Sequence, residues 1–510
     1  MTVYNINQGI GWASSGVEYA QSYRGKILRE LGIPAKFIFT DIMRGDNIQE
    51  MTRALDFEDD EVIWLYRFYT DFTIEPCSLR EEDIAPSFPE GDYTVNVIST
   101  GKKQYVYKDD NRFLTIYFSR TYTDKVCKVE FVDSGCLIRT DYYTSGKIFS
   151  EYSAPFEGQA RVYMRRFFNR DGSTAFEEYL TYTSNKDLWE KSSLYKFPDG
   201  IFYSKMELAE DFMKKLPLED GDIIIADRTT LMGQAIFKHR GNHKLGVVIH
   251  AEHFSESLTD EDNILWNNFY EYPFHHSDEV DFFITSTEKQ KENLARQFEK
   301  YFNRKPKIVA IPVGSLDKLR RPEKARKPHA LCTVSRLAPE KHIDWVVRAV
   351  VEAREKVGDL TLDIFGRGVE EKRISDLIKE NNAGDYIKLR GHQKMDEIYK
   401  DYSGYIAGST SEGFGLSLME AVGSGLPMIG LDVPYGNQTF IEDGKNGYLI
   451  PYPDGGGLDS KALIHEFADR IDKLFNEDHV SEFSMYSYMI AEDFLTEKIE
   501  KKMKTLLEEL

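Results

Sequence analysis

One stretch towards the C-terminal end, residues 405–425, limits most strongly what this 510-residue chain can fold into. It opens with a short apolar run, residues 405–407, which indicates the end of a buried strand. Gly413 and Gly415 follow, and helix-forming residues begin at Leu416. This order predicts a strand, a glycine loop and a helix. The loop suits a phosphate, because glycine has no Cβ atom to keep a ligand from the backbone and a helix start offers unpaired N–H groups.

Two carboxylates frame this loop, Glu412 before the glycines and Glu420 inside the expected helix. Carboxylates accept hydrogen bonds from sugar hydroxyls, so the pair could hold two ends of one ligand with a phosphate between them. The alternative is a loop cap followed by a glutamate that faces solvent. Because the pair brackets a glycine loop between a strand and a helix, we favour the ligand-binding interpretation.

The N-terminal end has a similar order of elements. Residues 2–7 indicate a strand, glycines at 9, 11 and 16 form a loop, a helix follows, and residues 36–40 indicate a second strand. The glycine spacing differs from the G-x-G-x-x-G fingerprint of dinucleotide-binding domains. Asp41 stands near the place of a ribose-binding acid, so a dehydrogenase stays as a weaker alternative. Gly16 either contacts a diphosphate or allows a tight turn.

From about residue 75 to 205 the pattern changes to short aromatic and β-branched runs separated by turn signals. Strands this close together predict an antiparallel meander, because parallel pairing needs long crossovers. We therefore expect a β-rich domain inserted into the first α/β domain. Open sheet edges and exposed aromatic residues favour a partner-binding role, and a scaffold without a ligand fits the same pattern. The runs include Tyr93–Ser99, Gln104–Tyr107, Phe113–Phe118, Lys125–Val132, Gln159–Phe168 and Ala175–Thr183.

After residue 206 strands and helices alternate again. His250, Glu252 and His253 follow the end of an expected strand, where ligands bind in open α/β sheets. Their order is not a zinc signature, because a helical zinc site needs ligands one turn apart. Asp260-Glu261-Asp262 reads D-x-D, but we expect it to cap a polar helix start.

Several prolines near residues 306–325 indicate a linker to a second α/β domain. In that domain Arg336 and Lys341 come just after the first expected strand. A departing phosphate needs positive charge that strengthens as the bond breaks, and Arg and Lys supply it in different ways. The alternative is an ordinary surface pair beside a helix cap. The charged amphipathic segment 486–510 predicts a single C-terminal helix.

Composition excludes several classes of protein. The net charge of −20 argues against a nucleic-acid binder, which needs a basic face. The four cysteines have no C-x2-C spacing and suggest neither a disulfide framework nor a zinc site. The N-terminus lacks a secretory signal, and no apolar run approaches ~18 residues. We expect a cytoplasmic location, with peripheral contact to the membrane left open.

Together the motifs resemble those of a known family. Glu412-x7-Glu420 is similar to the E-x7-E motif of retaining GT-B glycosyltransferases, in particular glycosyltransferase family 4. A closer resemblance, over nearly the whole chain, is to the GtfA family, bacterial enzymes that begin the O-glycosylation of serine-rich-repeat adhesins in the accessory Sec system. The stretches that carry it are Gly9-Ile-Gly-Trp-Ala-Ser-Ser-Gly-Val-Glu-Tyr, Ile249-His-Ala-Glu-His, Ser335-Arg-Leu-Ala-Pro-Glu-Lys-His and Asp432-Val-Pro-Tyr-Gly-Asn-Gln-Thr.

The resemblance implies an α/β protein of the GT-B fold, with two Rossmann-like domains and a β-meander domain inserted in the first. Residues 1–75 and 206–310 would form the acceptor-side domain, and residues 76–205 the inserted extended β-sheet. Residues 311–485 would bind the UDP-sugar. Residues 486–510 would form a helix that crosses back to the first domain.

The resemblance also implies roles for single residues. Arg336 and Lys341 would hold the diphosphate, Glu412 and His250 the transferred sugar, and these four form the expected catalytic set. The expected donor-binding residues are Gly16, Val17, Glu18 and Tyr19 in the first domain, and Arg390, Gly391, Gly413, Phe414, Gly415, Leu416 and Glu420 in the second. Arg390 and Gly391 would read the base, and Glu420 the ribose. We expect no metal site.

The implied reaction is retaining transfer of N-acetylglucosamine (GlcNAc) from UDP-GlcNAc to serine or threonine hydroxyls of a serine-rich-repeat adhesin, with no cofactor besides the donor. The implied partner is a GtfB-type paralogous subunit that helps to hold the acceptor. Two alternatives remain: the same chemistry with UDP-glucose, and a non-catalytic subunit that only binds the acceptor. The intact glutamates and cations argue against the second, because a subunit without turnover has no need of them.

Overall fold

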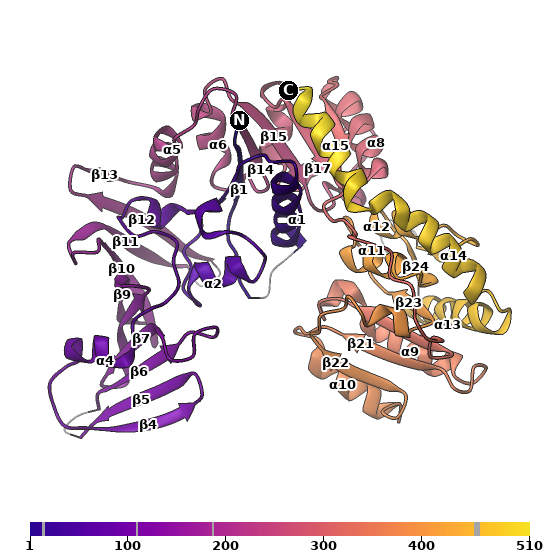
Figure 1. The fold of residues 1–510 in the computed structure, drawn as a ribbon, viewed down its shortest axis with the longest axis horizontal. Coiled ribbons are helices and arrows are strands. Elements are labelled where there is room, and N and C mark those ends of the chain that lie inside the picture. The colour runs from indigo at the N-terminus through magenta and orange to yellow at the C-terminus, as the bar shows by residue number, and fades with distance from the viewer. Residues whose placement is uncertain (13–15, 109–110, 186–187, 453–458) are drawn as a thin grey trace. The chain divides into compact units, whose positions relative to one another are not determined.

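The computed structural model describes residues 1–12, 16–108, 111–185, 188–452 and 459–510. The chain divides into two compact units, Met1–Gly246 and Val247–Leu510, and each is described by itself. Both contain helices and strands (Figure 1).

A largely parallel sheet begins the fold. In the described residues its seven strands have the order β19-β18-β15-β14-β1-β2-β3. The inner strand β1 is buried along its whole length and pairs in parallel with β2 and β14, as expected for a sheet covered on both faces. The elements of this part in the first unit are β1 (Val3–Asn7), α1 (Gly16–Glu30), β2 (Ala35–Phe39), α2 (Ile48–Arg53), β3 (Val62–Trp64), α3 (Leu65–Phe68), α5 (Lys205–Lys215), β14 (Ile223–Ala226), α6 (Gly233–His239) and the first part of β15 (Lys244–Ile249).

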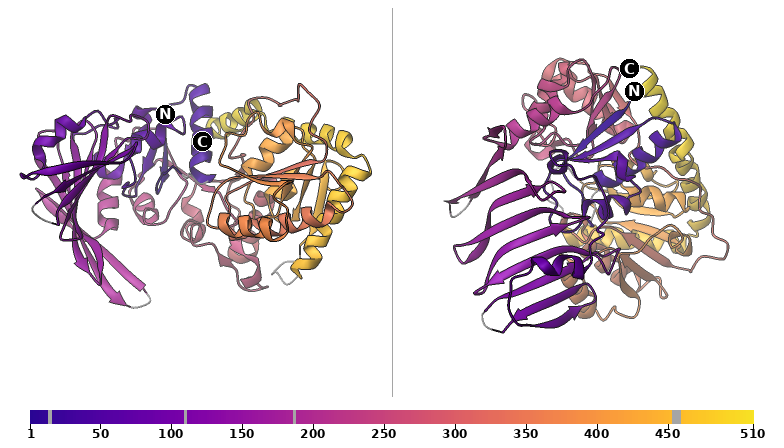
Figure 2. Two further views of the ribbon diagram at one scale, coloured as in Figure 1. Left: turned by 90° about the horizontal axis from the view of Figure 1, so that it is seen from below. Right: turned by 60° about the vertical axis from the view of Figure 1, so that its left-hand side comes forward.

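The expected antiparallel meander is confirmed. Its strands follow one another in a single sheet of order β13-β12-β11-β10-β9-β8-β7-β6-β5-β4, the purple and magenta arrows of Figure 2. Each strand pairs with the next in antiparallel orientation. The elements are α4 (Glu81–Ile84), β4 (Tyr93–Ser99), β5 (Lys102–Tyr107), β6 (Phe113–Phe118), β7 (Val126–Asp133), β8 (Cys136–Tyr143), β9 (Lys147–Phe156), β10 (Gln159–Phe168), β11 (Thr174–Asn185), β12 (Leu188–Phe197) and β13 (Gly200–Phe202).

Stacked aromatic rings explain the aromatic composition of this sheet. Phe149, Phe167 and Phe176 form a stacked series with ring centroids 5.2 and 4.3 Å apart. In the same sheet Arg165, which is only 1 % exposed, pairs with Glu151 at 2.7 Å and Glu178 at 2.6 Å. A buried guanidinium needs such partners, because an unpaired charge in the interior is costly.

The second unit begins within β15. Its short elements β16 (Phe254–Ser255) and β17 (Leu265–Trp266) form a separate pair. They are followed by α7 (Glu271–His275), β18 (Phe282–Thr285), α8 (Glu288–Gln297) and β19 (Ile308–Ala310).

Asp260 does not begin a helix as expected. Its carboxylate accepts the N–H groups of Asp262 and Asn263 and closes a turn instead, so these side-chain contacts replace the expected helix start.

A second parallel sheet of order β22-β21-β20-β23-β24-β25 follows. Alternating residues of each strand point to opposite faces, so Leu331 packs with α9, α10 and α13 while Cys332 packs with α11 and α14. The elements are β20 (Ala330–Val334), α9 (Ile343–Ala353), β21 (Thr361–Phe365), α10 (Glu371–Glu380), β22 (Ile387–Gly391), β23 (Gly404–Ala407), α11 (Leu416–Gly423), β24 (Met428–Asp432), α12 (Gly436–Phe440), β25 (Gly447–Pro451), α13 (Ser460–Asn476), α14 (Val480–Ala491) and α15 (Thr496–Glu508).

The C-terminal segment is not the single helix that its charge pattern predicted. Helices α14 and α15 are separated at Glu492–Leu495, where Leu495 takes an extended backbone. The break has a physical cause: the carbonyl oxygen of Phe494 accepts the N–H of Leu316 at 2.8 Å, and the N–H of Thr496 donates to Leu316 at 2.9 Å. These bonds to the preceding linker replace bonds within a helix.

Candidate active site

At the carboxyl-terminal edge of the second sheet, backbone segments from different strands lie very close together. A Cβ atom on Gly366 would lie 1.9 Å from the carbonyl oxygen of Ser335, and one on Gly368 would lie 2.2 Å from that of Leu337. Only glycine fits at such distances. Gly391 ends β22 beside them and has a φ of +67°. Gly366 and Gly368 were not among the predicted site residues, although glycines directly after a strand are a readable signal of close approach.

The glycine loop and the helix after it lie where the sequence predicted them. Strand β23 ends at Ala407, and α11 begins at Leu416. Gly415 precedes the helix with a φ of +85°, which side chains rarely tolerate. A Cβ atom on Gly413 would lie 2.5 Å from the carbonyl oxygen of His250, so the loop touches the segment after β15 directly. Phe414 is buried, and Leu416 is half-buried.

Lys341 and Glu412 meet at this loop. The Lys341 ammonium lies 2.6 Å from the Glu412 carboxylate, and the two side chains are 17 % and 21 % exposed. Lys341 ends a short 3-10 turn, Pro339–Lys341, whose neighbouring backbone also contacts the loop: the N–H of Thr410 donates to Glu340 at 3.2 Å. The pair therefore combines charge with partial shielding from water, which strengthens electrostatic interactions.

Arg336 lies apart from this pair. Its side chain is 71 % exposed and forms an ion pair with Glu340 at 2.8 Å. Arg390 is also partly exposed, but its Nε donates to Asp363 at 2.9 Å, and Asp363 accepts the hydroxyl of Tyr402 at 2.6 Å. The structure thus joins Lys341 to Glu412, anchors Arg390 at the end of β22, and leaves Arg336 facing solvent.

Glu420 projects from α11 and accepts a hydrogen bond from the hydroxyl of Tyr399 at 3.0 Å. The pKa of its carboxyl group is raised to about 7, chiefly because burial penalises the charged form, and the nearby Asp396 acts in the same direction. The Tyr399 hydrogen bond and Arg320 act in the opposite direction. Glu420 therefore changes charge near neutral pH, a property typical of functional carboxyl groups.

The segment after β15, residues 250–253, lies against the glycine loop. The backbone N–H groups of His250 and Ala251 both donate to the hydroxyl of Tyr270 at 3.0 Å. Glu252 accepts the hydroxyl of Ser411 at 3.4 Å, and burial raises the pKa of its carboxyl group. His250 is half-buried beside Gly413, so this predicted residue does lie at the loop.

Comparisons with known proteins decide the family. Residues 97–199 match the family described as GtfA extended beta-sheet domain, and residues 316–487 match Glycosyl transferases group 1. A relative from Streptococcus gordonii, named UDP-N-acetylglucosamine--peptide N-acetylglucosaminyltransferase GtfA subunit, is 49% identical over 100% of this chain and 99% of its own. The chain belongs to the GtfA family. The resemblance read from the motifs is confirmed.

Two solved structures of the GtfA family extend the comparison. The crystal structure of the pneumococcal O-GlcNAc transferase GtfA in complex with UDP and GlcNAc has a TM-score of 0.92 and 46% identity, and the match covers 100% of this chain and 99% of that one. The crystal structure of the GtfA/B complex has a TM-score of 0.87 and 48% identity with the same coverage. The predicted GT-B fold with its inserted sheet is therefore confirmed, and the chain is a glycosyltransferase.

The N-terminal glycine loop of this GtfA family member lies in the first unit. Val17 and Glu18 are buried at the start of α1, and Tyr19 is 38 % exposed. The side-chain amide of Asn7 donates to the Glu18 carboxylate at 3.2 Å. Residues 13–15 of the loop lie outside the described residues, and Gly16 begins the helix. Asp41 is paired with Lys205 at 2.8 Å.

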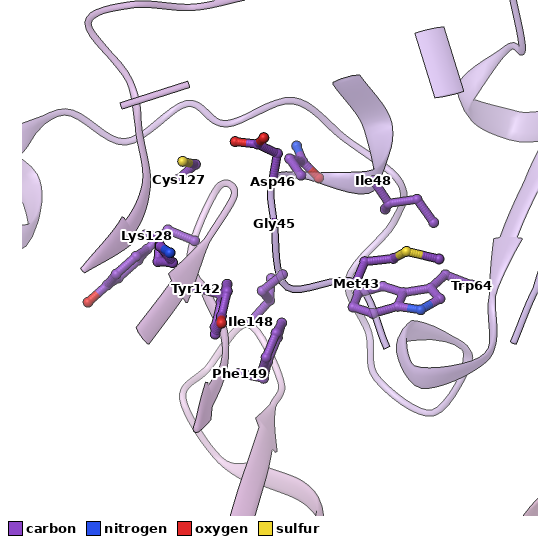
Figure 3. Close-up of a pocket in the computed structure, with 12 residues that line it drawn as sticks. Met43, Gly45, Asp46, Ile48, Trp64, Cys127, Lys128, Tyr142, Ile148 and Phe149 are labelled. Carbon is purple, nitrogen blue, oxygen red and sulfur yellow. The ribbon is translucent and has the colours of Figure 1, made fainter. Parts of the chain in front are cut away.

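A cavity of about 10 Å³ also lies in the first unit (Figure 3). Met43 and Trp64 line it from the α/β part, and Cys127, Tyr142 and Phe149 from the inserted sheet. Such a volume holds about one water molecule, whereas small-molecule sites have volumes of several hundred Å³. The cavity is therefore too small for a sugar nucleotide.

The described residues contain no group of three or more His, Cys, Asp or Glu side chains placed to hold a metal ion. In the same part of the chain, no helix is both long and apolar enough to span a membrane.

Proposed function

We propose that the protein transfers GlcNAc from UDP-GlcNAc to serine or threonine hydroxyls of a serine-rich-repeat adhesin, with retention of configuration, as the first step of O-glycosylation. The observation that carries the proposal is the partly shielded Lys341–Glu412 pair on a glycine loop that touches His250. The name of the S. gordonii relative and the UDP and GlcNAc of the pneumococcal structure support this donor.

The proposed roles follow from chemistry. Lys341 holds the departing diphosphate, and Arg336 joins it, since an exposed ion pair such as that with Glu340 is worth ~1 kcal/mol or less and is easily broken. Glu420 accepts the ribose hydroxyls. The Arg390–Gly391 segment reads uracil through backbone groups. Glu412, with the loop Gly413–Leu416 and His250, holds the sugar.

The proposed reaction takes place on one face of the sugar. The bond from C1 to the diphosphate oxygen breaks as the acceptor oxygen forms its own bond to C1. The departing phosphate oxygen takes the proton of the acceptor hydroxyl, so no separate protein nucleophile is needed. The fixed positive charge of Lys341 favours this step, because the negative charge on the phosphate grows as the bond breaks. We propose no metal ion and no cofactor.

The proposed partner is a GtfB-type paralogous subunit, supported by the solved GtfA/B complex at 48% identity. The peptide named in the activity of the S. gordonii relative supports a protein acceptor. We place this reaction in the cytoplasm, where UDP-sugars are made, and leave peripheral membrane contact as a secondary proposal. The Gly16–Tyr19 segment is proposed to be donor-binding as well.

The test is a panel of UDP-sugars with a serine-rich peptide, read by intact mass, with and without the partner subunit. We expect addition of N-acetylhexosamine. Addition of hexose alone would support the glucose alternative, and no transfer under any condition would support a non-catalytic subunit. Lys341→Ala should lower turnover about 100- to 1,000-fold. Lys379→Ala, an exposed lysine on α10, is the matched control and should leave turnover unchanged.

A further inference from the structure

Tyr435 connects the two sides of the candidate site within the unit Val247–Leu510. It follows β24 and is 2 % exposed. Its hydroxyl oxygen accepts a hydrogen bond from Nδ2 of Asn293 on α8 at 2.9 Å and lies 3.3 Å from Nδ1 of His253. His253 in turn has its Nε2 atom 2.6 Å from Oε1 of Gln297, the last residue of α8. The four side chains form one continuous chain of hydrogen bonds.

The direction of every bond in this chain is fixed. The Oε1 atom of Gln297 only accepts, so Nε2 of His253 carries the proton and Nδ1 is the acceptor. The Tyr435 hydroxyl therefore donates to His253 while it accepts from Asn293. His253 is fully buried, and burial lowers its pKa to about 4, so the imidazole is neutral at physiological pH. A buried network in which each group is satisfied is rigid.

The backbone of the same residue holds Glu412. The N–H groups of Tyr435 and Gly436 both donate to the carbonyl oxygen of Glu412 at 2.8 Å. The next residue of the loop, Gly413, is the one that touches the carbonyl of His250. The hydroxyl chain thus fixes Tyr435 against α8 and His253, and Tyr435 fixes the loop that carries Glu412.

We propose that Tyr435 is a positioning residue, whose hydroxyl group sets the register of the Glu412–Gly415 loop against the backbone of His250. Its effect on catalysis rests on the proposed function: a loop out of register would displace the sugar from the charge of Lys341. A ring that served only as core packing would act differently, because loss of one oxygen atom would leave the loop in place. The two roles make opposite predictions for Tyr435→Phe.

The experiment compares Tyr435→Phe with Tyr488→Phe in the full-length chain. Tyr488 is a suitable control because it is also buried and its hydroxyl also forms hydrogen bonds, at 3.0 Å to Arg320 and 3.1 Å to Ser424. Hydrogen exchange of the backbone amides is measured first, since it requires no activity. We expect exchange in residues 408–416 and 435–437 to become at least about tenfold faster in Tyr435→Phe and to stay unchanged in Tyr488→Phe.

Transfer of GlcNAc to a serine-rich peptide is measured second, together with UDP affinity by calorimetry. We expect kcat to fall about 10- to 100-fold in Tyr435→Phe while the Kd for UDP stays within about twofold, because a small misplacement of the reacting groups is costly. Asn293→Ala should have the same kind of effect. The double variant should lose little more than Tyr435→Phe alone, because both changes break one chain.

Three outcomes would overturn the proposal. Unchanged amide exchange in Tyr435→Phe would show that the hydroxyl does not hold the loop. Faster exchange with an unchanged kcat would show that the register has no catalytic effect. An equal loss of kcat and of UDP affinity would indicate a general collapse of the site. If the wild-type protein transfers no sugar at all, the proposed function fails, while the exchange measurement still decides whether Tyr435 sets the register.

Discussion

Glu420 has an acidic side chain whose pKa of about 7 lies at physiological pH. Burial is the main cause, and it acts by penalising the charged form. A ribose hydroxyl that donates to this side chain prefers the ionised form, because a carboxylate accepts more strongly than a carboxylic acid. Donor binding and proton release are therefore linked at this residue.

This linkage predicts that UDP binds more tightly as pH rises through 7. Between about pH 6 and pH 8 the ionised fraction of a group with a pKa near 7 rises about tenfold, so the Kd should fall by up to about tenfold. Glu420→Gln cannot ionise at this position, so its Kd for UDP should depend less on pH. The dependence that remains would come from ionisation of UDP itself. Calorimetry at three pH values measures both proteins. Identical slopes would contradict the role of Glu420.

The structure brings some of the predicted site residues together, but the conformations of their side chains could not be predicted from the sequence. Lys341 and Glu412 are 71 positions apart, and the structure brings them to 2.6 Å. Arg336 is five positions from Lys341, yet it points to Glu340 and solvent. The rotamer of an exposed side chain is decided by weak ion pairs with nearby residues, and such pairs leave no pattern in the sequence. The role of Arg336 at the diphosphate stays a prediction.

At the scale of elements, the glycine loop is positioned by contacts that tolerate no side chain. A Cβ atom on Gly408 would lie 2.8 Å from the carbonyl oxygen of His342, and one on Gly436 would lie 2.2 Å from that of Phe414. Each of these neighbours is backbone and cannot move aside cheaply. The loop is therefore held on several sides by glycines that come from different elements.

Gly413→Ala should consequently displace the loop from His250. The added Cβ atom would lie 2.5 Å from a carbonyl oxygen, so we expect a loss of about 1–3 kcal/mol in stability and of at least about tenfold in turnover. Gly384→Ala is the control, because nothing lies within 4 Å of its Cβ position. Thermal unfolding and UDP release measure the two effects. Equal behaviour of the two variants would show that the contact with His250 is unimportant.

Elements were predictable where their signal is local. The alternation of strands and helices, the glycine loop at 408–415 and the tight turns of the inserted sheet all follow from short-range patterns. The break between α14 and α15 does not, because it depends on bonds from Phe494 and Thr496 to Leu316, about 180 positions away. The network of Tyr435 and His253 escaped prediction for the same reason, although both residues lie within motifs that carried the family resemblance.

At the scale of the whole chain, the residues at the start of helix α15 are hydrogen-bonded to the linker (residues 306–325) between the two parallel sheets. Leu316 in this linker exchanges hydrogen bonds with Phe494 and Thr496, and the hydroxyl of Thr496 also donates to Ser315 at 3.1 Å. Farther along, Glu509 pairs with Lys307 just before β19 at 3.0 Å. The start of helix α15 is therefore hydrogen-bonded to the linker at Leu316, and Glu509, the residue after the helix, pairs with Lys307. The crossing of this helix back to the first domain stays a prediction.

Ile499→Ala tests this contact with the linker. Ile499 is fully buried on α15, and removing its side chain should cost about 2–5 kcal/mol. If α15 holds the linker, the amides of Leu316 and Thr496 should exchange faster, and turnover should fall even though no substrate-binding residue has changed. Lys502→Ala, on the exposed face of the same helix, should leave stability, exchange and turnover unchanged. Loss of stability with unchanged exchange at Leu316 would mean that α15 packs on the unit without controlling the linker.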